Sequence, residues 1–166
     1  MQLLRLPVIL LTLLGSAGLL HGCNRQAAPK PTLYSVKINN ATWMVELAVT
    51  QQEQERGLAG RDSLPDGRGM LFLYDEPRVM EYWMKGCRIP LDIAFIDANH
   101  KIVRIHTMAC EPPEIRFKTY SSDVPALYAL EVPAGAFAKA GVKVDDTVTF
   151  DPNIPVTAKA PTTSGR

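Results

Sequence analysis

The strongest constraint on the fold of this chain is a series of short strand-like segments separated by turn residues. In the 166-residue sequence these segments cover 33–38, 42–49, 70–74, 78–83, 91–96, 101–108, 126–132 and 147–150. The run Asn39-Asn40-Ala41 is typical of a hairpin turn between the first two. The capping-box pattern Thr50-Gln51-Gln52-Glu53 predicts a helix that ends at Gly57, and a second helix is predicted at 134–140. We therefore expect a mostly β fold, a single-domain β-sandwich or barrel-like roll with two short helices.

The first 23 residues have the pattern of an export signal. Arg5 supplies a positive charge, and the apolar stretch at 6–14 is too short to span a bilayer as a helix. Small residues then lead to Leu20-His21-Gly22-Cys23. This order resembles the signal of bacterial lipoproteins, in which cleavage before the cysteine frees it to carry lipid. We expect residues 1–22 to be a signal peptide and Cys23 the site of lipid attachment; the alternative is an ordinary secretory signal with an incidental cysteine.

The rest of the chain divides by composition into three parts. Residues 23–32 are polar and contain proline, which is typical of a flexible tether. Residues 33–151 form the predicted β domain, and residues 152–166 have few large apolar groups, which predicts a disordered tail. We expect a membrane-anchored lipoprotein that faces the periplasm or the cell exterior. Asn24, rather than an aspartate, follows Cys23, and by resemblance to bacterial sorting signals this favours the outer membrane.

The charge balance narrows the possible partners. The formal net charge of the chain is +1, and removal of residues 1–22 takes away only Arg5 among the charged residues. No basic run or basic helix face is evident, so nucleic acid is not a predicted partner. The expected partners are the membrane, through the lipid anchor, and an unknown small molecule or envelope protein. The sequence gives no sign of a cofactor.

Several motifs occur in a fixed order between residues 36 and 150. They are Glu55-Arg56-Gly57-Leu58, Gly69-Met70-Leu71-Phe72, Trp83-Met84-Lys85, the segment 89–97 and the segment 128–135. Together they resemble the domain of unknown function 192 family. The resemblance implies a compact, mostly β domain of sandwich type, often exported, and no established activity. The chain departs from the family pattern at Gly86-Cys87, where Asn-Thr is usual, and at Asp145-Asp146, where Gly-Asp is usual.

Two cysteines remain in the predicted domain, Cys87 and Cys110. If Ile96 pairs with Lys101 in a hairpin, the two cysteines fall opposite each other on antiparallel strands, close to disulfide reach. An exported chain with an even pair of cysteines favours a disulfide. The alternatives are two free thiols or a metal site completed by His106.

A polar cluster is the best candidate for a binding site. Asp92 is an acid within an apolar strand, and a buried acid is costly unless it is paired or hydrogen-bonded. The cluster could form a ligand pocket with Trp83 as its floor. Alternatively, Asp92 could form a structural ion pair with one of the cations that fixes strand register. The tentative binding residues are Arg56, Arg61, Trp83, Lys85 and Asp92.

Signals of catalysis are weak. Asp92 and His106 are predicted to lie in facing strands and could act as acid and base, but no nucleophile accompanies them. Glu131 also lies between apolar residues, and we interpret its neighbours 129 and 133 as a solvated strand face. The favoured function is an envelope lipoprotein with a binding or accessory domain. The alternatives are an enzyme acting on a cell-envelope substrate and a purely structural domain.

Overall fold

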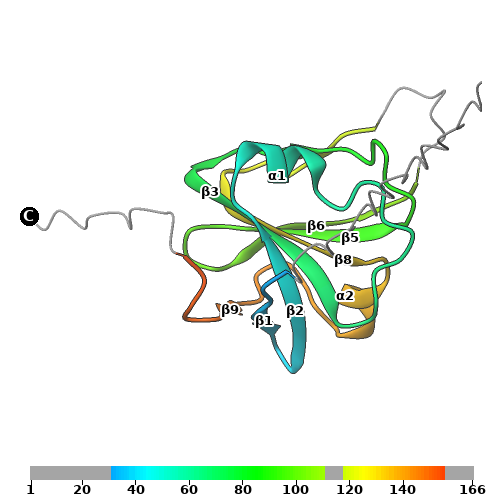
Figure 1. Ribbon diagram of the computed structural model, residues 1–166. Helices are drawn as coiled ribbons and strands as arrows, with labels where there is room; N and C mark the ends of the chain where they lie inside the picture. The colour runs from blue at the N-terminus through cyan, green and yellow to red at the C-terminus, as the bar shows by residue number, and fades with distance from the viewer. Residues whose placement is uncertain (1–30, 111–117, 156–166) are drawn as a thin grey trace, which may run out of the picture. The chain divides into compact units, whose positions relative to one another are not determined.

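The computed structural model describes residues 31–110 and 118–155. The predicted signal peptide, Cys23 and most of the tether and tail therefore lie outside the described residues. The elements follow the chain in the order seen in Figure 1: β1 (Tyr34–Ile38), β2 (Ala41–Ala48), α1 (Gln51–Arg56), β3 (Arg68–Arg78), β4 (Glu81–Tyr82), β5 (Leu91–Ile96), β6 (Ile102–Met108), β7 (Tyr120–Ser121), β8 (Ala126–Pro133), α2 (Ala136–Lys139) and β9 (Val148–Phe150). The prediction of a mostly β fold with two short helices is confirmed.

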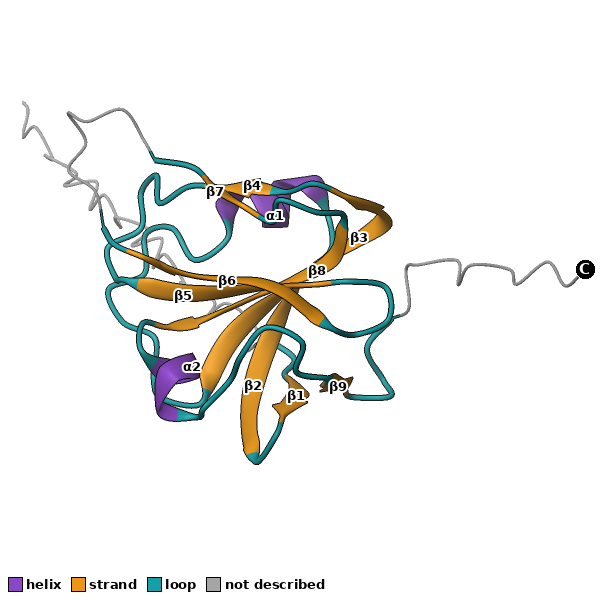
Figure 2. Ribbon diagram, turned by 180° about the vertical axis from the view of Figure 1, so that it is seen from behind, coloured by secondary structure: helices purple, strands orange, loops and turns teal. Residues whose placement is uncertain are grey.

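One curled sheet organises the domain. Its strand order is β6-β5-β8-β3-β2-β1-β9, and a separate two-stranded sheet pairs β4 with β7. Neighbouring strands are antiparallel except β2 and β3, which run parallel. Figures 1 and 2 show the large sheet curling as an incomplete barrel, so the roll is the observed form rather than a sandwich of two large sheets.

Local sequence signals explain the predicted helix start and the first hairpin. Thr50 accepts a hydrogen bond from the Glu53 backbone N–H, and the Glu53 carboxylate accepts one from the Thr50 N–H, so the capping box is present. The β1–β2 hairpin pairs Ile38 with Ala41 across a two-residue turn, in which Asn39 has a φ of 53°. Asparagine tolerates this left-handed conformation better than most residues.

Each face of the curled sheet packs its own hydrophobic cluster. One cluster contains Trp43 and Leu130, lies on the α2 side and includes Phe137 of that helix; we name it the α2 core. The other contains Phe72 and Phe95 and lies beneath β4; we name it the β4 core. Figure 2 shows α2 on one side of the central strands and β4, β7 and α1 on the other. Both faces of the central strands are therefore buried, which a near-continuous apolar run in a strand allows.

The β5–β6 hairpin differs from its predicted register. Leu91 pairs with Met108, and Ile96 pairs with Ile102 after a shift between Phe95 and Ile96. The Asp97 carboxylate accepts hydrogen bonds from the backbone N–H groups of Asn99 and Lys101, 2.8 Å each, and so holds a wider turn than expected. The predicted pairing of Ile96 with Lys101 is wrong. Over most of the hairpin the register is displaced by two residues.

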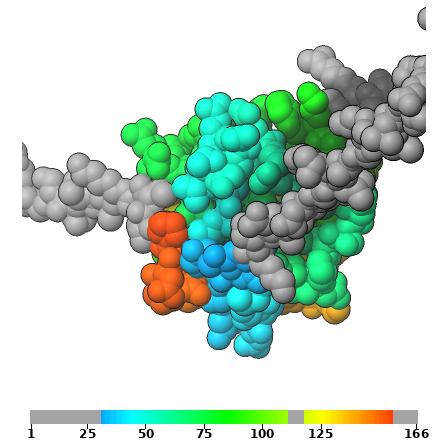
Figure 3. Space-filling model, viewed as in Figure 1, coloured from blue at the N-terminus to red at the C-terminus, as the bar shows by residue number. Residues whose placement is uncertain are grey.

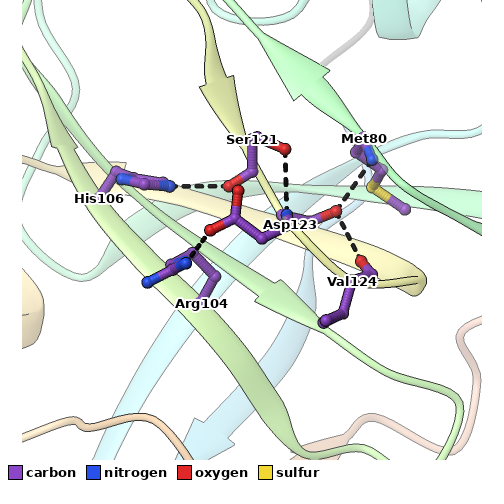
Figure 4. A network of polar contacts seen from close by, with 7 residues as sticks. Met80, Arg104, His106, Ser121, Asp123 and Val124 are labelled. Atoms are coloured by element: carbon purple, nitrogen blue, oxygen red, sulfur yellow. Dashed lines mark hydrogen bonds and ion pairs between the residues drawn. The ribbon is translucent and has the colours of Figure 1, made fainter.

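The small sheet is tied to its surroundings by polar contacts. The Met80 backbone N–H donates to Ser122 Oγ at 2.9 Å, and that hydroxyl donates to the carbonyl of Val124 at 2.7 Å. An ion pair joins Arg104 of β6 to Asp123 (Figure 4). These contacts fix the segment that covers the β4 core from outside. They also hold Met80, the residue directly before β4.

Candidate ligand-binding site

A cavity of about 470 Å³ lies between the β4-core face of the sheet and the segments that cover it. Its cover comes from α1, which lies at the surface of the domain in Figure 3, from the loop after α1, and from β4 with the turn that follows it. Trp83 at the cavity is 56% exposed, whereas Phe72 is 1% exposed and Glu131 is 5% exposed. The cavity therefore extends from an open rim at Trp83 to a buried floor at Phe72 and Glu131.

Glu131 is the most unusual residue of this cavity. It lies in the middle of the sheet, with Met70 of β3 on one side and Ile93 of β5 on the other. Within residues 31–110 and 118–155 its carboxyl group has no hydrogen bond or ion pair, but no fully buried side-chain oxygen there lacks a partner, so the carboxyl oxygens open onto the cavity. Burial of the residue raises its pKa to about 8. A carboxyl with this pKa is mostly protonated at neutral pH. Glu131 is therefore a neutral acid that faces the cavity and can both donate and accept a hydrogen bond.

The interpretation of Glu131 as part of a solvated strand face is wrong. Strand β8 lies between β5 and β3, so it is internal to the sheet. The side chains before and after Glu131, Leu130 and Val132, enter the α2 core, while Glu131 points to the β4-core side. Because segments cover both sides of this strand, neither face meets solvent. The alternation of side chains identifies opposite faces correctly but does not say that one of them is exposed.

Two glycines allow neighbouring segments to approach closely: Gly69 lets β3 pass β8 on the α2-core side of the sheet, and Gly57 lets the end of α1 approach the floor of the cavity. A Cβ at Gly69 would lie 2.5 Å from the Glu131 carbonyl oxygen, so no side chain fits where β3 and β8 pass. Gly57, with a φ of 47°, ends α1 above the ring of Phe72. A residue with a side chain would be strained in that conformation. Both glycines belong to the motifs that carry the family resemblance.

A pair of tyrosines forms one wall. The hydroxyls of Tyr74 and Tyr82 lie 2.8 Å apart, and the Tyr82 ring packs edge-on against Phe72 and Phe95 at centroid distances of 5.2 and 5.5 Å. Burial, followed by the neighbouring Tyr74, raises the pKa of Tyr82 well above its usual value. Tyr82 therefore stays uncharged at physiological pH and fixes the position of β4 over the sheet.

Cys87 lies beside Glu131 at the cavity. Burial, followed by the nearby Glu131 and Cys110, raises the pKa of the Cys87 thiol to about 11, so the thiolate needed of a nucleophile is scarce at neutral pH. Both cysteines are thiols in this structure. The register that motivated the disulfide is wrong, but the disulfide itself stays a prediction. Among the described residues, no group of three or more His, Cys, Asp or Glu side chains is arranged to hold a metal ion.

Three of the five predicted binding residues line this cavity: Arg56, Trp83 and Lys85. Arg61 does not. Its guanidinium makes two hydrogen bonds to the Glu46 carboxylate, at 2.6 and 2.7 Å. This contact lowers the pKa of Glu46 and raises that of Arg61. Arg61 is thus part of an ion pair beside the cavity rather than of its lining.

Asp92 is buried on the opposite face of the sheet. Its carboxylate accepts a hydrogen bond from Thr107 Oγ1 at 2.7 Å and one from the Phe137 backbone N–H at 3.2 Å. It therefore anchors the start of α2. The expected ion pair with Arg56, Arg61 or Lys85 is absent from the described residues, so that interpretation is wrong; hydrogen bonds satisfy the acid instead.

The structure does not bring Asp92 and His106 together. Thr107 is the direct partner of Asp92 in the hairpin, and His106 is the partner of Ile93. Because successive side chains point to opposite faces, Asp92 faces the α2 core and His106 the β4 core. The His106 Nε2 lies 2.8 Å from the carbonyl of Ser121 (Figure 4), which occupies it in a structural contact.

The fold and the cavity define a small β domain built on one curled sheet, with a buried acid at the floor of a surface cavity. The chain belongs to the domain of unknown function 192 (DUF192) family, whose model, described as an uncharacterized ACR, matches residues 34–150. No curated protein matches the chain significantly. Among the residues that the structure describes, no helix is long and apolar enough to cross a membrane.

Two solved structures are similar to this chain. One is a protein from Sinorhizobium meliloti described as a candidate transcription regulator, with 30% identity and a TM-score of 0.67; the match covers 74% of this chain and 96% of that one. The other is a protein of unknown function from Novosphingobium aromaticivorans, with 31% identity and a TM-score of 0.64; the match covers 70% of this chain and 84% of that one.

Proposed function

We propose that this domain binds a small molecule in the cavity above Glu131. The observation that carries the proposal is the buried carboxyl of Glu131, which faces the cavity and has no partner among the described residues. Because no fully buried side-chain oxygen of the described residues lacks a partner, the Glu131 oxygens must be accessible from the cavity. A polar group placed at an otherwise apolar floor can fix the orientation of a bound ligand. The cavity volume of about 470 Å³ falls within the range common for small-molecule sites.

We further propose that the domain works at the cell envelope, held to a membrane by lipid on Cys23. The support is the order of residues 1–23 and the polar tether that follows. Mass spectrometry of the native protein tests this part. We expect a chain that begins at residue 23 and carries acyl groups on Cys23. An unmodified Cys23, or retention of residues 1–22, would contradict the anchor without affecting the cavity.

The two other functions considered from sequence have less support. An enzyme that uses Asp92 and His106 as acid and base would need both groups at one site, and the hairpin register puts them on opposite faces. A purely structural domain would not need an unpartnered carboxyl at the floor of a cavity. In that case, replacement of Glu131 would improve stability and change no binding.

The binding proposal can be tested by thermal unfolding of the full chain in detergent. The probes are a panel of sugars, amino acids and small organic acids, since a ligand that binds the folded state raises the unfolding temperature. We expect stabilisation by at least one class of compound in the wild type and loss of that stabilisation in Glu131→Leu. Glu76→Gln, an exposed acid on β3 away from the cavity, is the matched control and should behave as the wild type. A panel with no Glu131-dependent stabilisation would refute the proposal.

A further inference from the structure

We propose that the ligand of this cavity is an acidic sugar, whose hydroxyls bond the floor at Glu131 and whose carboxylate pairs with Arg56 and Lys85 at the rim. The inference rests on the proposed function, because it names the class of ligand for the same cavity. Three features of the lining carry it: two rim cations that have no ion pair among the described residues, an acid at the floor that is not ion-paired with them, and an exposed indole at the same rim.

The rim cations favour an anionic ligand. The lining holds three cations, Arg56, Arg78 and Lys85, against the two exposed acids Glu55 and Glu81. Neither Arg56 nor Lys85 forms a hydrogen bond or ion pair within the described part of the chain, although hydrogen bonds and, to a smaller extent, the charge of Arg56 lower the pKa of Glu46 and Glu53. The segments of Arg56 and Lys85 are joined by the bond from the Gly60 N–H to the Gly86 carbonyl, at 2.9 Å. The arginines that do have acidic partners are Arg61, Arg88 and Arg104, with Glu46, Asp62 and Asp123.

At the floor of the cavity, Glu131 favours an uncharged polar group on the ligand. Burial is the cause of the raised pKa of Glu131, with no lowering by a nearby cation. Neither Arg56 nor Lys85 forms an ion pair with Glu131, so the floor is uncharged when its carboxyl is protonated. A protonated carboxyl donates one hydrogen bond and accepts others, which matches the hydrogen-bonding capacity of a hydroxyl.

The walls between floor and rim favour a ring with an apolar face. Trp83 is 56% exposed at the rim, whereas Leu58 and Phe72, which also line the cavity, are 1% exposed. An aromatic ring offers a flat apolar surface together with a polar edge. The C–H face of a sugar ring can lie against such a surface while its hydroxyls point to polar groups. An acidic sugar combines this face with hydroxyls for the floor and a carboxylate for the rim.

The test is isothermal titration of the full chain in detergent with glucuronate, glucose and glucosamine, which have the same ring and differ in charge. We expect affinity to fall in that order. The double variant Arg56→Gln/Lys85→Gln should weaken glucuronate about tenfold, since each exposed ion pair contributes modestly, and should leave glucose unchanged. Arg88→Gln removes an exposed cation outside the cavity lining and should leave all three affinities unchanged.

The outcomes separate this inference from the proposed function. If glucose or glucosamine binds as tightly as glucuronate, and Glu131→Leu abolishes that binding, the acidic class is wrong but the cavity remains the site. If none of the three sugars binds, the inference is wrong, and the wider panel of compounds decides the proposed function. Equal weakening of glucuronate by Arg88→Gln and by the double variant would also overturn it, because the effect would then be one of net charge.

Discussion

Two buried acids, Asp92 and Glu131, lie on opposite faces of the same sheet and differ in how they are satisfied. Asp92 is 2% exposed and Glu131 is 5% exposed, so their burial is nearly equal. Asp92 accepts a hydrogen bond from Thr107 and another from the start of α2. Glu131 has no such partner among the described residues and faces a cavity. Burial alone therefore does not separate a structural acid from a candidate binding acid; the partners do.

Asp92 and Glu131 also differ in their effect on the stability of the fold. Hydrogen bonds to a charged group stabilise a protein by more than neutral ones do, so Asp92 contributes to the stability of the fold. Burial of Glu131 disfavours its charged form, so this carboxyl takes up a proton and costs stability above the pKa that it has in the unfolded chain. One face of the sheet thus holds an acid that helps the domain fold. The other holds an acid that the domain would fold better without.

The largest expected effect is the dependence of stability on pH that Glu131 causes. Its pKa is about 8 in the folded domain and about 4.5 in the unfolded chain. Between these values the folded state holds a proton that the unfolded state has lost, so the free energy of unfolding falls as pH rises. The loss is on the order of 4–5 kcal/mol across this window. Denaturant unfolding of the wild type and Glu131→Gln from pH 5 to 9 should show the variant gaining relative stability as pH rises.

The informative quantity is the difference in the free energy of unfolding between the wild type and Glu131→Gln at each pH, not the wild-type curve alone. Carboxyls such as Glu46, whose pKa is lowered by Arg61, give the opposite slope at acid pH. Both proteins share these groups, so the difference isolates Glu131. Glu76→Gln serves as the control, and its curve should run parallel to that of the wild type. Parallel curves for Glu131→Gln as well would mean that Glu131 has an ordinary pKa and a partner.

The second largest expected effect is a loss of stability when Asp92, on the α2-core face of the sheet, is replaced. Asp92→Ala should lower the free energy of unfolding by about 3 kcal/mol, because it removes two hydrogen bonds and leaves the Phe137 N–H buried without an acceptor. Asp92→Asn keeps one acceptor oxygen and should lose less. Denaturant unfolding at pH 7 measures both. If Asp92→Ala were as stable as the wild type, the assignment of Asp92 as a structural anchor would be wrong.

Much of the fold could be predicted from the sequence because its signals are local. The capping box at Thr50 and the asparagine turn at Asn39 act through neighbouring backbone groups, and both are present as expected. The hairpin after Ile96 shows the limit of such reasoning. Its register depends on how Asp97 bonds the turn and on an irregularity in the ladder, neither of which can be read from a count of residues.

The candidate site was predicted only in part. Arg56, Trp83 and Lys85 line the cavity, and all three belong to motifs that stand out in the sequence. Asp92 was placed among the tentative binding residues and Glu131 on a solvated strand face, although each is an acid flanked by apolar residues in a strand; the structure puts Asp92 outside the cavity and Glu131 in its lining. Which face each acid occupies follows from strand order, and strand order is a property of the tertiary fold. A signal was nonetheless present for Glu131, since the apolar character of 126–132 is typical of a strand buried on both faces.

The smallest expected effect links the titration of Glu131 to ligand affinity. If the neutral acid donates a hydrogen bond to a sugar hydroxyl, only the protonated form binds well. With a pKa of about 8, raising the pH from 7 to 9 should weaken glucuronate binding about tenfold. The groups whose pKa Glu131 itself influences are Tyr82 of β4, whose pKa is raised well above its usual value, and Cys87, whose pKa is about 11. Neither changes charge substantially in this range. The other charged or titratable groups of the lining are Glu55, Arg56, Tyr74, Arg78, Glu81 and Lys85.

Isothermal titration of glucuronate at pH 7, 8 and 9 measures this dependence. Glu131→Gln keeps a donor and an acceptor at the floor but does not titrate, so its affinity should stay constant over the same range. A wild-type affinity that is flat across these pH values would show that the ligand does not depend on the proton of Glu131. An affinity that rises with pH would contradict the proposed bond, because glucuronate has no cationic group that a charged Glu131 could attract. The sign of this slope thus decides which charge state of Glu131 the cavity uses, and with it whether Glu131 is the functional counterpart of the structural acid Asp92.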